Sequence, residues 1–172
     1  MRTELYWIPG PWSGRLAIMP RPRGGDWLED EVRSWRQARV DAVLSLLTPD
    51  EVAEFGLTDE ADLCVANAMQ FDSFPIGDRS VPASRAGFAR LVAGVAQQLG
   101  QGKSVAIHCR QGIGRAPLVA IGALTSSGID AETAIQRVSL ARGSAVPETI
   151  EQRRWIVDIA RSLTSQASTA LI

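Results

Sequence analysis

The sequence predicts an α/β fold in which a largely parallel central sheet is flanked by helices. Short apolar runs rich in β-forming residues alternate along the chain with longer segments whose apolar residues recur at helical spacing. Strands that alternate with helices pair in parallel through crossover connections, and helices then cover both faces of the sheet. The length of 172 residues and the hydrophobic content of 45% fit one domain, which we take as residues 1–172.

The N-terminal half is predicted to contain four strands and two helices. The strand candidates are apolar runs bounded by turn residues. They cover residues 5–8, 15–19, 42–47 and 68–74. Leu28, Val32 and Trp35 follow the spacing i, i+4, i+7, which predicts a helix over residues 26–38. The motif Thr48-Pro49-Asp50-Glu51 is a capping box with proline at the first helical position, so a short helix should begin there.

The C-terminal half is predicted to contain one strand and four helices. The strand is the apolar run Ser104–His108, which is predicted to be fully buried. Each helix begins at a cap or a proline and carries apolar residues on one face. The helices cover residues 82–100, 116–124, 130–143 and about 147–163. The polar residues from about 164 to 172 are expected to form a mobile tail.

The junction between strand and helix carries the most informative residues, His108-Cys109-Arg110-Gln111-Gly112-Ile113-Gly114-Arg115. The thiol of Cys109 and the guanidinium of Arg115 stand at the two ends of one tight loop. Backbone N–H groups at such a junction, together with the positive end of the helix dipole, form an anion site. The same field stabilises a thiolate on Cys109, and Arg115 can grip two phosphate oxygens. This strand–loop–helix site should lie at the carboxyl end of a central strand.

His-Cys-x-x-Gly-x-Gly-Arg at residues 108–115 resembles the signature loop of the cysteine-dependent protein tyrosine phosphatases. The nearest branch is the small dual-specificity phosphatases, including the cyclin-dependent kinase-associated phosphatases, and the resemblance spans residues 27–155. It implies that a phosphomonoester is hydrolysed through a phosphocysteine intermediate on Cys109, without a metal or other cofactor. The phosphate-binding residues would be Arg110, Gln111, Gly112, Ile113, Gly114 and Arg115.

The segment Phe74–Pro82 is similar to the part of the family that carries the general acid, and Asp78 is the residue that matches. The resemblance implies that Asp78 gives a proton to the departing alcohol and later takes one from the hydrolytic water. Asp72 is the competing carboxylate. One departure from the family is Ala116, where most relatives carry Ser or Thr. That hydroxyl helps the thiolate leave, so its loss implies a slower second step.

Four further residues have roles that the sequence only suggests. His108 is expected to be structural, to hydrogen-bond the loop and to support thiolate formation. Gln152 resembles a glutamine that places the hydrolytic water in some relatives, although a surface glutamine is an equal alternative. Arg110 either adds charge for a second phosphate or faces solvent. Cys64 is expected to be buried in the core rather than bonded to Cys109.

Three other classes of protein share part of the loop pattern. A rhodanese-type sulfurtransferase also presents a cysteine between strand and helix, but persulfide chemistry has no use for the Asp78 segment. Arsenate reductases of the low-molecular-weight phosphatase type carry the Cys-x5-Arg pattern near the N-terminus. A noncatalytic phosphoprotein-binding module would lose the nucleophile or the acid, whereas Cys109, Arg115 and Asp78 are all present.

Composition restricts the partners. A net charge of −1 and a pI near 5.9 give no general attraction to nucleic acid or to an anionic membrane, so any affinity for phosphate must be local. The N-terminal residues lack a signal peptide's apolar run, and two cysteines do not make a disulfide scaffold. We expect a cytoplasmic monomer acting on a phosphorylated protein, with no nucleic-acid or membrane partner.

Overall fold

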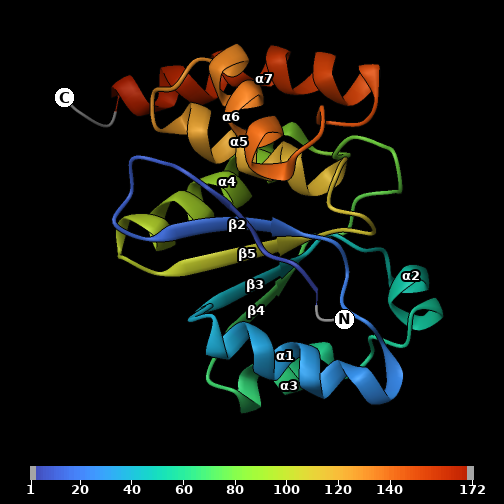
Figure 1. Ribbon diagram of the computed structural model, residues 1–172. Coiled ribbons are helices and arrows are strands. Elements are labelled where there is room, and N and C mark those ends of the chain that lie inside the picture. Colours follow the sequence, from blue (N-terminus) through green and yellow to red (C-terminus); the bar gives the residue numbers. More distant parts are fainter. Residues whose placement is uncertain (1–2, 170–172) are drawn as a thin grey trace.

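The computed structural model describes residues 3–169 and consists of a five-stranded sheet between two layers of helices (Figure 1). The strands are β1 (Tyr6–Ile8), β2 (Arg15–Met19), β3 (Ala42–Ser45), β4 (Gln70–Ser73) and β5 (Ser104–His108). Their order across the sheet is β1-β2-β5-β3-β4, and only β1 runs antiparallel to its neighbour. The predicted α/β fold with a largely parallel sheet is confirmed.

The helices separate by position along the chain. The C-terminal helices cover one face of the sheet, and the short helices of the N-terminal half lie on the other side or beyond the strand ends (Figure 1). The first group is α4 (Arg85–Gly100), α5 (Arg115–Ser126), α6 (Ala131–Arg142) and α7 (Ile150–Thr169). The second group is a 3-10 turn (Gly25–Trp27), α1 (Leu28–Gln37), α2 (Pro49–Glu54) and α3 (Glu60–Ala66). Each face of the sheet therefore has its own hydrophobic cluster, one containing Leu118 and Phe88 and the other Trp35 and Val32.

Strand β5 is the centre of the fold, and all five of its residues are buried. Met19 at the end of β2 and Ser45 at the end of β3 both pair in register with His108. The pairing continues beyond the strands, because Leu46 N–H donates to the His108 carbonyl (3.0 Å) and Ile76 N–H donates to the Leu46 carbonyl (3.0 Å). The segments that follow β5, β3 and β4 consequently lie side by side at the carboxyl edge of the sheet.

Two elements differ most from the predictions, and α4 also begins at Arg85 rather than at residue 82. Helix α3 was not predicted, because the buried residues on its inner face are Glu60 and Cys64 rather than a run of large apolar residues. The predicted end of the last helix near residue 163 is wrong, since α7 begins at Ile150 and continues to Thr169. No proline or glycine interrupts residues 164–169, so their polar character does not stop the helix. Residues 170–172 of the predicted tail lie outside the described part of the chain.

Candidate active site

Cys109 follows β5 directly and its side chain is buried, with 2% of its surface exposed. The N–H group of Ala116, in the first turn of α5, donates to the Cys109 sulfur at 3.5 Å. The sulfur thus lies at the amino end of a twelve-residue helix, where it faces that N–H group and the positive end of the helix dipole. Since residue 116 is alanine, no hydroxyl on that side chain can bond to the sulfur.

The loop after Cys109 is held by contacts to its carbonyl oxygens. The Arg110 carbonyl accepts from Arg21 N–H at 3.2 Å, and the guanidinium of Arg142 donates to the carbonyls of Gln111 and Gly112, each at 3.2 Å. In a planar trans peptide the C=O and N–H groups point in opposite directions. Three carbonyls that face Arg21 and Arg142 therefore turn the following N–H groups toward the inside of the loop, where an anion would bind.

Arg115 is the first residue of α5, and its guanidinium is almost fully enclosed. Its two terminal nitrogens form a fork on Glu51, with distances of 2.7 and 2.9 Å, and Nη1 also donates to the Ile76 carbonyl at 2.8 Å. Glu51 is the last residue of the predicted capping box, and its bond to the Thr48 N–H is present at 2.9 Å. One carboxylate thus caps α2 and fixes the orientation of Arg115.

The Glu51–Arg115 pair changes the pKa of both groups. Burial raises the pKa of Glu51, but hydrogen bonds from Arg115 and the Thr48 N–H, with the charge of Arg115, bring the pKa below its ordinary value. Burial lowers the pKa of Arg115, but the Glu51 hydrogen bonds and the charges of Cys109, Glu51 and Asp78 raise it overall. Both groups are therefore charged at neutral pH.

Asp78 lies on the loop that follows β4, and it faces the same arginine. Its Oδ1 accepts from Arg115 Nη2 at 3.0 Å, and its Oδ2 lies 3.5 Å from Arg110 Nη1. The competing carboxylate of Asp72 is on β4 and lines a different hollow, together with residues of α4. The structure thus brings Asp78, and not Asp72, to Cys109 and Arg115; that Asp78 acts as the acid stays a prediction.

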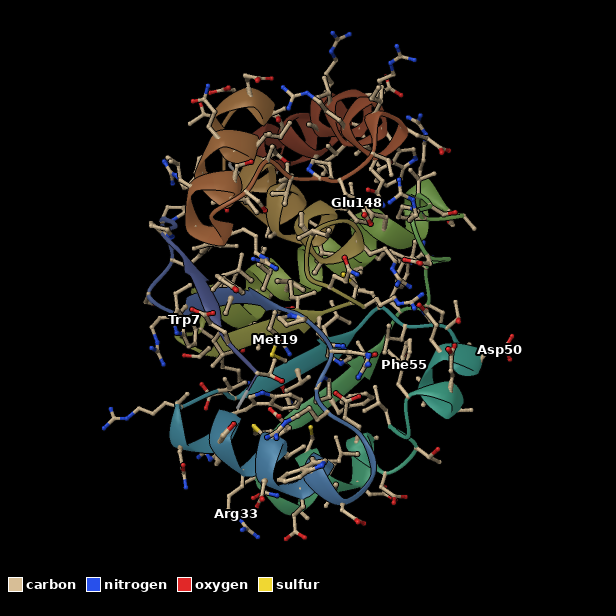
Figure 2. The ribbon with its side chains drawn as sticks, turned by 45° about the vertical axis from the view of Figure 1, so that its right-hand side comes forward. Trp7, Met19, Arg33, Asp50, Phe55 and Glu148 are labelled. Carbon is tan, nitrogen blue, oxygen red and sulfur yellow. The ribbon has the colours of Figure 1, made fainter. Side chains whose placement is uncertain are left out.

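These side chains surround a pocket of about 110 Å³. Its lining residues are Asp78, Arg79, Cys109, Arg110, Gln111, Ile113, Gly114, Arg115 and Glu148. Gly112, predicted as a phosphate-binding residue, is not among them, and it packs against the backbone of Met19 instead. Arg79 and Glu148 were missed, and they pair with each other at 2.9 Å. Figure 2 shows Glu148 on the side of the C-terminal helices and Phe55 near α2.

His108 does not bond to the loop as expected. Its Nε2 pairs with Glu60 Oε1 at 2.7 Å, and both side chains are buried. Within residues 3–169, Nδ1 of His108 has no hydrogen-bond partner. Cys64 is a free, buried cysteine on the same helix as Glu60, as predicted for a core residue. Burial, with the charge of Glu60, raises the pKa of Cys64 to about 12, so this thiol is not ionised at neutral pH.

Gln152 is fully buried, so its interpretation as a surface residue is wrong. Its amide nitrogen donates to the Ser80 carbonyl at 3.0 Å, and its amide oxygen accepts from Thr149 N–H at 3.2 Å. Gln152 therefore joins the Asp78 loop to the beginning of α7. Arg110 is half-exposed and lies over the ring of Phe55, with 5.3 Å from its guanidinium carbon to the ring centroid. It stands at the rim of the pocket.

The part of the chain that the structure describes contains no cluster of three or more His, Cys, Asp or Glu residues able to hold a metal ion. It also contains no helix with the length and apolar character needed to cross a bilayer.

Comparisons with known proteins agree with this geometry. The family model described as "Polymorphic toxin system, DSP-PTPase phosphatase" matches residues 17–129. The crystal structure of kinase-associated phosphatase (KAP), with its catalytic-site cysteine replaced by serine, superposes with a TM-score of 0.87 at 19% identity, covering 96% of this chain and 98% of that one. Tk-PTP in its active form has a TM-score of 0.70 at 26% identity, with coverages of 89% and 93%.

A third similar structure is TpbA from P. aeruginosa in complex with pTyr, with a TM-score of 0.61 at 16% identity and coverages of 89% and 85%. No curated protein matches the sequence.

Proposed function

We propose, since the chain belongs to the DSP-PTPase phosphatase family, that it hydrolyses phosphomonoesters through a phosphocysteine intermediate. The observation that carries this proposal is the position of the Cys109 sulfur, which receives the Ala116 N–H at the amino end of α5 while Arg115 is locked beside it by Glu51. A thiolate and a fixed guanidinium on one loop are the two groups that in-line attack on a phosphoryl group requires.

The hydrogen bonds of Arg115 indicate which edge of the guanidinium receives the phosphate. Both N–H groups of Nη1 are used by Glu51 and the Ile76 carbonyl, and Nη2 is shared between Glu51 and Asp78. A phosphate that binds through two oxygens therefore uses Nε and the Nη2 hydrogen that Asp78 now occupies. Substrate binding would displace Asp78 from Arg115 and leave its carboxyl group beside the leaving oxygen.

The first chemical step follows from this arrangement. The Cys109 thiolate forms a bond to phosphorus as the bond from phosphorus to the alcohol oxygen breaks, and protonated Asp78 gives its proton to that oxygen. The loop N–H groups and Arg115 hold the three remaining oxygens, where charge is concentrated. In the second step, water attacks phosphorus, the bond between sulfur and phosphorus breaks, and inorganic phosphate leaves.

A phosphorylated protein is the substrate class that we propose. The structure of TpbA with pTyr supports a phosphoamino acid as a ligand of this fold. Measuring the relative kcat/KM for phosphotyrosine peptides, phosphoserine peptides, phosphoinositides and RNA 5′-triphosphates would test this choice. A clear preference for either of the last two would contradict it.

The nucleophile is tested by Cys109→Ser. We expect hydrolysis of p-nitrophenyl phosphate to fall below detection, because the thiolate is lost, while inorganic phosphate still binds, because Arg115 and the loop N–H groups remain. Steady-state kinetics and calorimetric titration with phosphate measure the two effects. Substantial turnover by this variant would contradict the phosphocysteine mechanism.

A further inference from the structure

A second carboxylate, Glu148, faces the loop from the segment that precedes α7. Its side chain is 19% exposed, and its Oε2 accepts from Arg79 at 2.9 Å. The other oxygen points at the loop, since a Cβ placed on Gly114 would lie only 2.5 Å from Oε1. Glycine at position 114 is therefore what allows this carboxylate to approach the loop that carries Cys109.

The two carboxylates of the pocket have different surroundings. Both oxygens of Asp78 face guanidinium groups, at 3.0 Å from Arg115 and 3.5 Å from Arg110. Oε1 of Glu148 accepts no hydrogen bond from any group within residues 3–169, so its lone pairs are available on the pocket side. The Arg79 pair and the bond from Gln152 to the Ser80 carbonyl tie the loop of Asp78 to the segment of Glu148. The carboxylates of Asp78 and Glu148 thus line the same pocket, Asp78 from the loop after β4 and Glu148 from the segment before α7.

The hydrolysis of the phosphocysteine places a particular demand on this site. Ala116 offers the sulfur only its backbone N–H, at 3.5 Å, and no side-chain hydroxyl to assist the departing thiolate. When the leaving group is poorly assisted, removal of a proton from the attacking water matters more to the rate. A base with a free lone pair at the mouth of the pocket would meet that demand.

We propose that Glu148 is a second catalytic carboxylate, which removes the proton from the water that hydrolyses the phosphocysteine. As the water oxygen bonds to phosphorus, its proton passes to Glu148, the bond between phosphorus and sulfur breaks, and the electron pair returns to Cys109 as a thiolate. Phosphate leaves and Glu148 releases the proton to solvent. Asp78 then acts mainly in the first step, in contrast to the single acid/base that the family resemblance implies. This inference rests on the phosphatase activity proposed above.

The test is the variant Glu148→Gln, compared with Glu151→Gln, in which the same change is made on the exposed first turn of α7. With p-nitrophenyl phosphate we expect kcat to fall about 100-fold. The kcat/KM value, which reports the steps through phosphoenzyme formation, should stay within about threefold of the parent value. A burst of nitrophenolate should appear, and acid quenching should trap phosphoenzyme on Cys109. Glu151→Gln should change none of these quantities.

Arg79→Gln separates catalysis from loop anchoring, because it removes the ion pair but leaves the Glu148 carboxylate in place. If Glu148 only anchored the Asp78 loop, both variants would lose kcat/KM to the same extent and neither would accumulate phosphoenzyme. That result, or an unchanged kcat in Glu148→Gln, would overturn the inference. Failure of the proposed function itself would be seen differently, as absence of turnover in the parent protein.

Discussion

Asp78 contacts Arg115 and Arg110 before substrate binds, and we propose it as the general acid of the first step. A phenol with a high pKa needs a proton as it departs, whereas nitrophenolate leaves almost unaided. Asp78→Asn should therefore lower kcat/KM for phenyl phosphate by about 10²- to 10⁴-fold, and only mildly for p-nitrophenyl phosphate. The comparison of the two substrates over a range of pH values measures this effect.

Asp72→Asn provides the control, since Asp72 is exposed on β4 and lines a different hollow. We expect it to behave like the parent protein with both substrates. If the effects of the two variants were exchanged, the acid would have to be assigned to Asp72.

The residues that could be predicted from the sequence are those whose relation is local. Cys109 and Arg115 belong to one loop, whereas Asp78, which is 37 residues before Arg115, was assigned only through the resemblance of its segment to the family. The supporting residues could not be predicted, because their partners are distant in sequence: Glu51 and Arg115 are 64 residues apart, and Glu60 and His108 are 48 apart. Spacing along a chain carries no information about such pairs until the register of the strands is known.

Among the structural elements, the turn at Gly112 requires glycine both for its backbone conformation and for its close contact with Met19. Its φ is +70°, and a Cβ would lie 2.8 Å from the carbonyl carbon and oxygen of Met19. Gly112→Ala should therefore destabilise the protein by about 1–3 kcal/mol, through strain and a backbone clash, and lower kcat by displacing the loop. Chemical denaturation and steady-state kinetics would measure the two effects.

Gly128→Ala is a matched comparison, because Gly128 also has a positive φ of +93° but no atom lies within 4 Å of its added Cβ. It should cost stability without altering kcat. Equal kinetics for the two alanine variants would mean that contact with Met19 does not position the loop.

The elements predicted best are those with strong local signals. Strand β5 has its predicted bounds, and α6 begins at the Asp130 cap and ends at Gly143 in the left-handed conformation, as expected. Helix α3 was missed because its buried face carries Glu60, which pairs with the imidazole of His108. A polar residue buried for a tertiary partner weakens the hydrophobic period on which the prediction depends.

At the scale of the whole molecule, the Glu51–Arg115 pair connects α2 to α5, which belongs to the layer of C-terminal helices. Although burial raises it, the pKa of Glu51 lies below its ordinary value of 4.5, because the Arg115 bonds outweigh burial. A carboxyl group whose pKa is lowered by folding contributes stability above its ordinary pKa, and the contribution is lost as pH falls through the folded value. Glu51→Gln should therefore cost about 3–5 kcal/mol at pH 7, by leaving Arg115 without its partner.

The difference in unfolding free energy between parent and Glu51→Gln should shrink as pH falls below 4.5. Denaturation at several pH values tests this, with Glu54→Gln, an exposed position on the same helix, as the control. A difference that did not vary with pH would show that the charge of Glu51 is not what stabilises the fold.

Strand β5 stands between β2 and β3 in the sheet, although it comes after both of them in the sequence. A growing polypeptide that has not yet reached residue 104 contains the strand pairs β1 with β2 and β3 with β4, but it lacks the strand that pairs with both β2 and β3. The nucleophile is the next residue after the strand that unites these groups. On the ribosome, the nucleophile is therefore added only after every strand of the sheet has been synthesised, and a chain that ends before residue 104 carries neither the central strand nor Cys109.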